Sequence, residues 1–571
     1  MNNQSAVINP TKIVVLGGGF SGVFCARYLA DLAGKNIQIE LISERNHFVF
    51  QPFLPEVAAG AISASDAVVP LRAMLKQANV RVRQATVRAI SHENKTVEIA
   101  VGRGRKRTLI SYDHLVFGMG LKVDLSRIPG LGEHAFKMKT LSDAFKLRNH
   151  VISRLEWADA TEYSDLRKSL LTFVVIGAGF SGIETIGEIQ EMIARVLPSY
   201  PRLNIEDVRF VVVEFQDRIL PELPPSLREY SLKTLQKRGV EFRLGVATKS
   251  ITGATVQLSD GSKIETSTVV ATIGNGPSDI ALDTGFTLER GRIVVDEFMK
   301  VKGCEDVWAI GDAACVLVEK PSPANKTSDL SSSLTADDYF VAPPTAQFAV
   351  RQARHLANNI HNEVIGSSLR RFRYSAKGAL ASLGNKAGCG TVYGFKVKGF
   401  LGWLVWRAFY LSFLPSIGTR LRVLSNWLID LFLPRNTVQI VPEEASSFRF
   451  EHFREGEVLA EDGMVSDDFY IVVEGAFELT ISEQDPMGPL VKVFRKGGHF
   501  GERMLLDLGF QKAGLMNAKP QEVLSGRVVA LEDSIALVIG KHDFELLSSY
   551  MPILEKYFDE YVLATYLSNR D

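Results

Sequence analysis

The sequence predicts an α/β protein with two parallel sheets, followed by a helical segment and a smaller β-rich domain. Three observations predict this organisation. A short apolar run, a glycine-rich loop and a helical pattern occur together twice, starting at Ile13 and Phe173. In each copy an acid ends a later strand-like run, as Glu44 and Glu214. From about residue 447 the pattern changes to short alternating strands separated by glycine turns.

Composition excludes several classes of protein. The 571 residues correspond to about three or four domains, since a domain usually holds roughly 100–200 residues. Lys plus Arg and Asp plus Glu both number 65, so no net charge attracts nucleic acid. A mean hydropathy of +0.06 excludes a polytopic membrane protein. The N-terminus shows no secretory signal pattern, so we expect a cytoplasmic core.

The cysteines exclude further classes. Four are present, none in a CxxC pair: Cys25, Cys304, Cys315 and Cys389. This spacing excludes a disulfide scaffold, a zinc ribbon and an enzyme that passes electrons to an adjacent cysteine pair. No metal site is predicted.

Both glycine loops have the GxGxxG pattern that opens a dinucleotide-binding βαβ unit. Gly17 allows a tight turn, Gly19 lets the backbone approach a pyrophosphate, and Gly22 lets the helix pack closely on the strand. The helix N-terminus then offers unpaired N–H groups to the phosphates. The second loop has the same glycines, and both have Phe and Ser before the last one: Gly177, Gly179, Gly182, Phe20, Ser21, Phe180 and Ser181.

Two dinucleotide sites follow, each with its own acid. Carboxylates such as Glu44 and Glu214 bind ribose hydroxyls and repel a 2′-phosphate, which favours NADH over NADPH in the second site. Gly274, after the strand-like run Val269–Ile273, is expected to border the same nucleotide.

A third motif assigns FAD to the first loop. A strand ending in Gly311 and Asp312 is typical of flavoproteins in which the aspartate accepts hydrogen bonds from the ribityl chain of FAD. Gly118 and Gly120 fit the crossover between the two domains. We therefore expect an FAD-binding, Rossmann-like domain at 10–165 and 286–395, with an NAD-binding, Rossmann-like domain inserted at 166–285.

The sequence resembles the type II NADH dehydrogenases, which are single-chain, non-pumping NADH:quinone oxidoreductases. The resemblance spans about 10–440 and depends mainly on four segments, 44–60, 343–357, 372–384 and 399–436. It implies that NADH reduces FAD and that a membrane quinone then collects the two electrons. The FAD is expected to be non-covalent, because no His or Cys stands in a flavin-linking motif.

The resemblance also implies site residues. Glu184 matches the glutamate near the nicotinamide. Lys377 matches a position at the flavin pyrimidine edge, where a cation stabilises the anionic reduced ring; the alternative is a solvated surface lysine. Ala346 and Gln347 lie in the segment 343–357, which is similar to the quinone-site helix. Both are expected to contact the cofactor, and Gln347 is also an expected catalytic residue.

One position departs from the family pattern. The quinone-site helix usually has a second Gln four residues after the first, on the same helix face. Here Arg351 occupies that position, and the next glutamine, Gln352, comes one residue late. We count Arg351 among the expected catalytic residues. A cation in place of a neutral amide predicts a change in the electron acceptor and not in NADH oxidation.

Residues 396–436 predict amphipathic helices that anchor the protein at a membrane surface. Phe400–Leu414 is 15 residues long, whereas a membrane span needs about 20. After Pro415, helical spacing places Leu421, Leu424, Trp427, Leu428, Leu431 and Phe432 opposite Arg422, Ser425, Asn426 and Asp430. Aromatic residues with basic flanks suit an anionic lipid surface.

We therefore expect a peripheral protein at the cytoplasmic face of the inner (plasma) membrane, and a homodimer. The alternative is a helix pair buried against the C-terminal domain or a dimer partner.

Residues 447–571 resemble the β-roll and closing helices of cyclic-nucleotide-binding domains. The resemblance implies that Gly501 and Glu502 contact a cyclic phosphate and ribose. Leu524 stands where the essential arginine is expected, and Arg527 lies three residues later on the same strand. Because side chains alternate along a strand, Arg527 is expected to point away from the pocket. We expect weak or absent cyclic nucleotide binding, and a regulatory role for the domain.

Two other functions are compatible with the sequence. One is an NAD(P)H-dependent flavin reductase with a soluble acceptor, against which the anchor segment argues. The other is a non-catalytic redox or ligand sensor.

Overall fold

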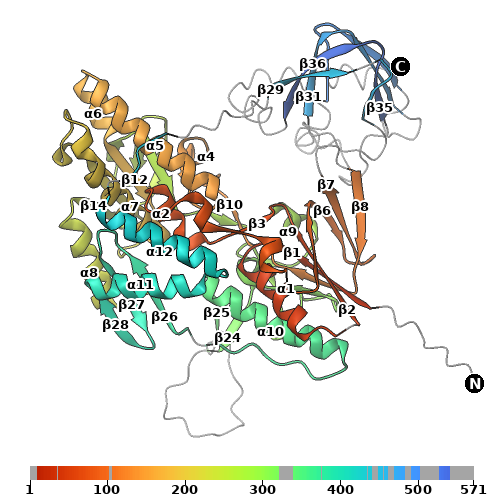
Figure 1. The fold of residues 1–571 in the computed structure, drawn as a ribbon, viewed down its shortest axis with the longest axis horizontal. Helices are drawn as coiled ribbons and strands as arrows, with labels where there is room; N and C mark the ends of the chain where they lie inside the picture. Colours follow the sequence, from red (N-terminus) through yellow and green to blue (C-terminus); the bar gives the residue numbers. More distant parts are fainter. Residues whose placement is uncertain are drawn as a thin grey trace, which may run out of the picture. The chain divides into compact units, whose positions relative to one another are not determined.

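The computed structural model describes residues 10–34, 36–76, 78–101, 106–319, 339–374, 376–433, 435–439, 448–453, 455–460, 468–481, 490–501 and 526–540 (Figure 1). They fall into two compact units. The first lies within Met1–Gln84, Ala89–Thr96 and Ser111–Ile440, and the second within Ala85–Arg88, Val97–Ile110 and Val441–Asp571.

A five-stranded parallel sheet contains the first glycine loop. Its order is β22-β9-β1-β2-β5. The strands are β1 (Thr11–Leu16), β2 (Ile37–Ser43), β5 (Val80–Gln84), β9 (His114–Phe117) and β22 (Val307–Ala309). The last four residues of β1 are fully buried, as expected for a central parallel strand covered on both faces. Helices α1 (Phe20–Leu32) and α10 (Ala346–Val364) lie side by side against this sheet (Figure 1).

A second five-stranded parallel sheet contains the second glycine loop. Its order is β11-β18-β12-β13-β14. The strands are β11 (Ala135–Lys137), β12 (Thr172–Ile176), β13 (Arg209–Glu214), β14 (Val240–Leu244) and β18 (Thr268–Ala271). Helix α7 (Phe180–Val196) follows β12. Two parallel sheets, each with a strand–loop–helix opening, confirm the two-Rossmann α/β fold.

Two helices follow a small antiparallel sheet near the end of the first unit. The sheet consists of β26 (Gly378–Ser382), β27 (Gly388–Val392) and β28 (Phe395–Lys398). The helices α11 (Gly399–Phe413) and α12 (Ile417–Phe432) lie next to each other, and α11 packs on β26 and β27 (Figure 1). No helix within the described residues combines the length and the apolar character that crossing a bilayer requires.

The second unit contains two four-stranded antiparallel sheets, which confirm the predicted C-terminal β domain. Their orders are β29-β36-β31-β34 and β30-β35-β32-β33. The strands are β29 (Phe448–Phe453), β30 (Val458–Ala460), β31 (Asp468–Glu474), β32 (Ala476–Ile481), β33 (Leu490–Arg495), β34 (His499–Phe500), β35 (Gly526–Ala530) and β36 (Ser534–Gly540). Aromatic residues such as Phe469, Phe477 and Phe500 form its core. Glu502, Leu524 and the predicted C-terminal helices lie outside the described residues.

Candidate active site

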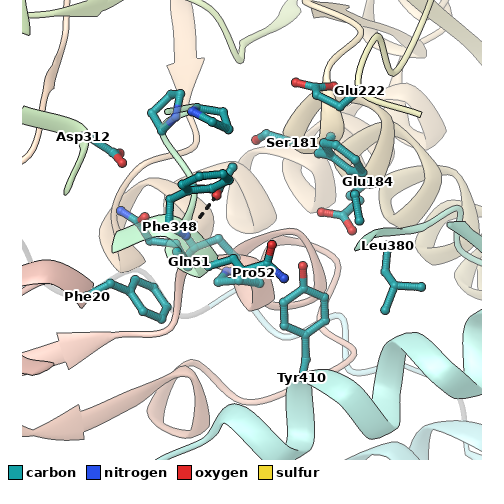
Figure 2. A pocket seen from close by; sticks show the side chains of 18 of the residues that line it. Phe20, Gln51, Pro52, Ser181, Glu184, Glu222, Asp312, Phe348, Leu380 and Tyr410 are labelled. Carbon is teal, nitrogen blue, oxygen red and sulfur yellow. Dashed lines mark hydrogen bonds between the residues drawn. The ribbon is translucent and has the colours of Figure 1, made fainter. Parts of the chain in front are cut away.

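A cavity of about 740 Å³ lies in the first unit, where the two glycine loops, α10, β26 and α11 approach one another (Figure 2). Phe20 and Asp312 line one side of the view, and Glu184 and Leu380 line the other. Tyr410, on α11, lies below them and closes the cavity on the side of the helix pair. Residues expected to serve two different dinucleotides therefore border one continuous space.

The first glycine loop forms a cradle that fits a pyrophosphate. Gly17 has a φ of 106°, and a Cβ atom there would lie 2.4 Å from the carbonyl oxygen of Gly118. A Cβ atom on Gly22 would lie 2.0 Å from the carbonyl oxygen of Gly17. At Gly19, in contrast, a Cβ atom would meet nothing within 4 Å. Gly19 is also the N-cap of α1 and has no side chain to cap the first N–H groups. The open side of the loop can therefore accept an anion.

The second loop has the same geometry. Gly177 has a φ of 103°, and a Cβ atom on Gly182 would lie 1.9 Å from the carbonyl oxygen of Gly177. A Cβ atom on Gly179, the N-cap of α7, would meet nothing within 4 Å. Phe180 and Ser181 follow it, and both line the cavity. Both loops therefore have the open shape that a pyrophosphate would need.

The two predicted acids differ in their surroundings. Glu214 accepts hydrogen bonds from the backbone N–H groups of Ala178, at 2.7 Å, and Gln216, at 3.0 Å, so its carboxylate is attached to the second loop. Glu44 is exposed just beyond the end of β2. Both acids stand at the carboxyl ends of strands next to a glycine loop, where a bound ribose is expected.

The predicted ribityl contact lies at the cavity wall. Gly311 adopts a φ of 72°, and its N–H donates to Oε1 of Gln352 at 2.7 Å. Asp312 follows, and burial raises the pKa of its carboxyl group, while Lys139 and Arg292 oppose that rise. Ser21 of the first loop donates to the carbonyl oxygen of Gly118 at 3.2 Å. The first bond connects the segment with Asp312 to α10, and the second connects the first glycine loop to the crossover.

Two further predicted glycines, one from each nucleotide site, adopt positive φ values. Gly120 has a φ of 74° and Gly274 a φ of 86°. A Cβ atom on Gly274 would lie 2.3 Å from the carbonyl oxygen of Asp124, so only glycine fits there. Its neighbours Ile273 and Asn275 line the cavity.

Glu184 is a buried acid at the cavity wall. Its exposed fraction is 7%. Oε1 of Glu184 accepts hydrogen bonds from the N–H of Ser382 and from Nε1 of Trp406, both at 3.0 Å. Burial raises its pKa to about 8, although both hydrogen bonds favour the anion and limit the rise. The side chain can therefore hold a proton near neutral pH.

Helix α10 brings three predicted residues to the cavity. Ala346, Gln347 and Arg351 all line it. The guanidinium of Arg351 lies 5.6 Å from the ring centroid of Tyr374. Gln352 is 1% exposed and turns toward Gly311 instead, so it does not replace the missing amide.

Lys377 lines the cavity next to Tyr393. The Nζ atom of Lys377 lies 5.5 Å from the ring centroid of Tyr393, and Lys377 is exposed. Lys377 therefore borders the cavity and is also exposed, and its role at the flavin edge stays a prediction.

The helix pair buries tryptophans together with a few other side chains, namely Trp403, Trp406 and Arg407 on α11 and Thr419, Val423 and Trp427 on α12. Trp427, expected on the apolar outer face, is 4% exposed and donates to Oε2 of Glu56 at 3.0 Å. Arg422 pairs with Asp66 at 2.7 Å. The guanidinium of Arg407 lies between the rings of Trp403 and Trp427, 4.2 and 4.4 Å from their centroids.

The exposed part of the pair is rich in large apolar side chains, although Arg422 and Ser425 are exposed too. The exposed large apolar residues are Phe400, Leu401, Leu404, Ile417, Leu421, Leu424, Leu428, Ile429, Leu431 and Phe432. We call these residues the outer face. The basic residue Arg435, which flanks the predicted anchor, lies inside the protein, since it is 6% exposed and pairs with Asp430 at 3.0 Å.

Sequence reasoning missed Ser382, Trp406 and Tyr410 as site residues. Trp406 and Tyr410 were assigned to the anchor. Residues 403–413 are rich in aromatic side chains, and Trp406 and Tyr410 are four residues apart on one helix face. Nothing in the local sequence shows that this face meets Glu184.

In the second unit, Gly501 follows β34 with a φ of 98°. Arg527 is exposed on β35, whereas Val528 and Ala530 lie in the core. Arg527 is therefore exposed while its neighbour Val528 is buried, and that it points away from a nucleotide pocket stays a prediction.

Three protein families match the chain. Pyridine nucleotide-disulphide oxidoreductase matches residues 11–353, the NDH2 C-terminal domain matches 376–436, and the cyclic nucleotide-binding domain matches 450–549. The first match alone covers more than half of the chain, and it contains both glycine loops.

Individual proteins give the same result. A probable NADH dehydrogenase of Dictyostelium discoideum is 28% identical over 439 residues, which cover 76% of this chain and 92% of that protein. A type II NADH:quinone oxidoreductase of Mycobacterium tuberculosis is 28% identical over 451 residues, with coverages of 76% and 91%. The structure of NDH2 from Plasmodium falciparum in complex with NADH shares the fold, with a TM-score of 0.67 at 19% identity over 75% of this chain and 100% of that chain. The chain belongs to the pyridine nucleotide-disulphide oxidoreductase family, as a type II NADH:quinone oxidoreductase with a C-terminal cyclic nucleotide-binding domain.

Proposed function

We propose that this chain oxidises NADH and passes two electrons, through non-covalently bound FAD, to a membrane quinone without pumping protons. The observation that supports this most is the single cavity bordered by both glycine loops and by the inner side of α11. The net reaction is NADH + H⁺ + quinone → NAD⁺ + quinol. NADH gives up two electrons, and the quinone accepts both of them with two protons to become the quinol.

The first cradle fits FAD. Gly17, Gly19 and Gly22 would hold its pyrophosphate, Glu44 its ribose, and Asp312 its ribityl chain. The supporting residues are Phe20, Ser21, Gly118, Gly120, Gly311, Ala346 and Gln347. FAD supplies a two-electron carrier when bound. The domain bounds we propose are 10–165 and 286–395 for FAD and 166–285 for NAD, although β11 (Ala135–Lys137) pairs within the second sheet.

The second cradle would hold NADH, with Gly177, Gly179, Gly182, Phe180, Ser181 and Gly274 around the nucleotide. The carboxylate of Glu214 stands beside this loop, where it would accept from ribose hydroxyls and repel a 2′-phosphate. Loop and acid therefore support a preference for NADH.

The acceptor side of the cavity would use Gln347, Arg351 and Lys377. The Arg351 and Lys377 cations favour negative charge on a reduced acceptor. Glu184, which we expect near the nicotinamide, lines the same cavity, and burial raises its pKa to about 8, so it could give a proton to the reduced acceptor near neutral pH.

The outer face supports peripheral attachment to a membrane. Contiguous exposed apolar side chains on a soluble protein mark an interaction surface, and an amphipathic helix pair fits the headgroup boundary of a bilayer. We place it at the cytoplasmic face of the inner membrane, on anionic lipid, in a homodimer. A quinone dissolved in the bilayer would then reach the cavity beside α11.

A steady-state assay of the purified protein tests this function. With NADH and a short-chain quinone, NADH oxidation should match quinol formation one to one, and acid should release FAD from the polypeptide. The control is Gly179→Ala, which places a methyl group in the open cradle and should impair NADH use without removing flavin. Reduction of ferredoxin but not quinone would indicate the soluble-acceptor reductase. Binding of NADH without turnover would indicate a sensor.

A further inference from the structure

The α11 helix reaches the acid at the cavity wall directly. Trp406 is 1% exposed and lies inside the protein, although its helix carries part of the outer face. Its indole Nε1–H donates to Oε1 of Glu184 at 3.0 Å. The same oxygen accepts from the N–H of Ser382 at 3.0 Å. Two donors from different elements therefore fix one oxygen of this carboxyl group, and Glu184 lines the cavity.

A second tryptophan makes the same kind of bond elsewhere. On α12, the indole of Trp427 donates to Oε2 of Glu56 at 3.0 Å. Glu56 is 2% exposed and pairs with Arg407 at 3.4 Å. Glu56 does not line the cavity, whereas Glu184 does. Both bonds attach the helix pair to the protein, but only the bond of Trp406 involves a group that lines the cavity.

We propose that Trp406 is a positioning residue for Glu184, and that α11 is thereby part of the acceptor site as well as part of the outer face. The proposal rests on the proposed function only in the role it gives to Glu184. The contact itself joins residues that lie 222 positions apart in the sequence.

The charges around Glu184 set the direction of the effect. Burial raises its pKa, Glu56 raises it further, and the N–H groups of Ser382 and Trp406 lower it. Glu184 in turn raises the pKa of Tyr410 on α11 and of Cys389 on β27. A hydrogen bond to the anion stabilises the ionised form, so loss of the Trp406 N–H should raise the pKa of Glu184. Glu184 would then keep its proton to higher pH.

The test is an infrared titration of the flavin-loaded protein, with neither NADH nor quinone present. The absorption of the protonated Glu184 carboxyl group is identified as the band that Glu184→Gln removes. Trp406→Phe keeps an aromatic ring but removes the donor, and its titration midpoint should move up by about one pH unit or more, as expected for a lost hydrogen bond to a charged group. Trp406→Met, a second variant without the donor, should give a shift of the same sign.

Trp427→Phe is the matched control, because it removes the same kind of bond from Glu56. Its Glu184 midpoint should stay near that of the unmodified protein. In kinetic assays, the alkaline limb of the quinone rate should move upward in Trp406→Phe, and this movement should vanish in a Glu184→Gln background.

Two results would overturn the proposal. One is an unchanged midpoint in both Trp406 variants. The other is an equal shift in Trp427→Phe, which would show a general effect of loosening the helix pair. Because the titration uses no acceptor, absence of quinone reduction with a shifted midpoint would reject the proposed function and leave the positioning role of Trp406 standing.

Discussion

The backbone N–H of Gly311 donates to the side-chain Oε1 of Gln352 at 2.7 Å. This buried bond joins α10 to the short 3-10 helix that contains Asp312. Gln352 therefore supports the flavin side of the site, while its neighbour Arg351 lines the cavity. The side-chain amide of Gln352, one residue after the position where the family usually has a glutamine, thus supports the backbone at Gly311. The group presented to the acceptor is a guanidinium.

Arg351→Gln should slow the acceptor half-reaction. A fixed cation favours a reduced acceptor that carries negative charge, so its loss should lower the rate of flavin reoxidation by quinone about tenfold, which corresponds to about 1.4 kcal/mol. Stopped-flow measurements separate this step from flavin reduction by NADH, which should change much less. An anionic, sulfonated quinone should lose more rate than a neutral one. Equal slowing of both half-reactions would contradict this assignment.

Gly19→Ala should reduce FAD binding without unfolding the protein. The methyl group would enter the open side of the first loop, where a Cβ atom meets no other atom, so the apo fold should keep its thermal midpoint. Flavin occupancy should fall several-fold by absorbance. Gly22→Ala is the comparison, because its methyl group would lie 2.0 Å from the carbonyl oxygen of Gly17 and should destabilise the fold itself. Normal flavin content in Gly19→Ala would argue against this cradle.

Glu214 should set the choice between NADH and NADPH. Its charge beside the second loop repels a 2′-phosphate, so we expect kcat/KM to favour NADH roughly ten- to a hundred-fold, about 1–3 kcal/mol. Glu214→Gln keeps one oxygen that can accept from the N–H of Ala178, loses the acceptor for the N–H of Gln216 and removes the charge, so it should narrow the ratio. Equal kcat/KM values in the unmodified enzyme would reject the prediction.

Substitutions on the outer face should release the protein from membranes without disturbing the site. We expect a triple change of Leu424, Leu428 and Phe432 to Ser to abolish sedimentation with anionic vesicles, because these side chains are exposed and apolar. Activity with a soluble dye should persist. Deletion of the whole helix pair is a poorer experiment, since it would leave the buried Glu56 without Arg407 and Trp427. Unchanged sedimentation of the triple variant would place the membrane contact elsewhere.

Cyclic AMP should bind the C-terminal domain weakly or not at all. Arg527 is exposed on β35 and points away from the core, so it cannot take the place of the arginine that the nucleotide family uses. Calorimetry on the full-length protein should show no saturable heat at micromolar ligand, and the kinetics should not respond. A micromolar dissociation constant that Glu502→Ala abolishes would show instead that the domain is a nucleotide-binding regulator.

The sequence by itself determined the two glycine loops, the strands and helices that flank them, and the change to a β-rich domain near residue 447. These features depend on local backbone requirements. Gly17 and Gly177 need positive φ values, Gly22 and Gly182 need close approach, and buried parallel strands need unbroken apolar runs. Such constraints act over a few residues and can be recognised in a single sequence.

Only the tertiary structure decided which side of α12 faces inward and which acid Trp406 contacts. Helical spacing separates an apolar side from a polar one, but it does not say which side meets the protein. Here Trp427, which helical spacing places on the apolar side, is buried with its indole N–H bonded to Glu56, while Arg422 and Asn426 bind the carboxylate of Asp66 at the edge of the helix. Burying polar groups is favourable only when partners are present to compensate for the lost water. Those partners come from chain segments hundreds of residues away, so the choice is made by long-range packing.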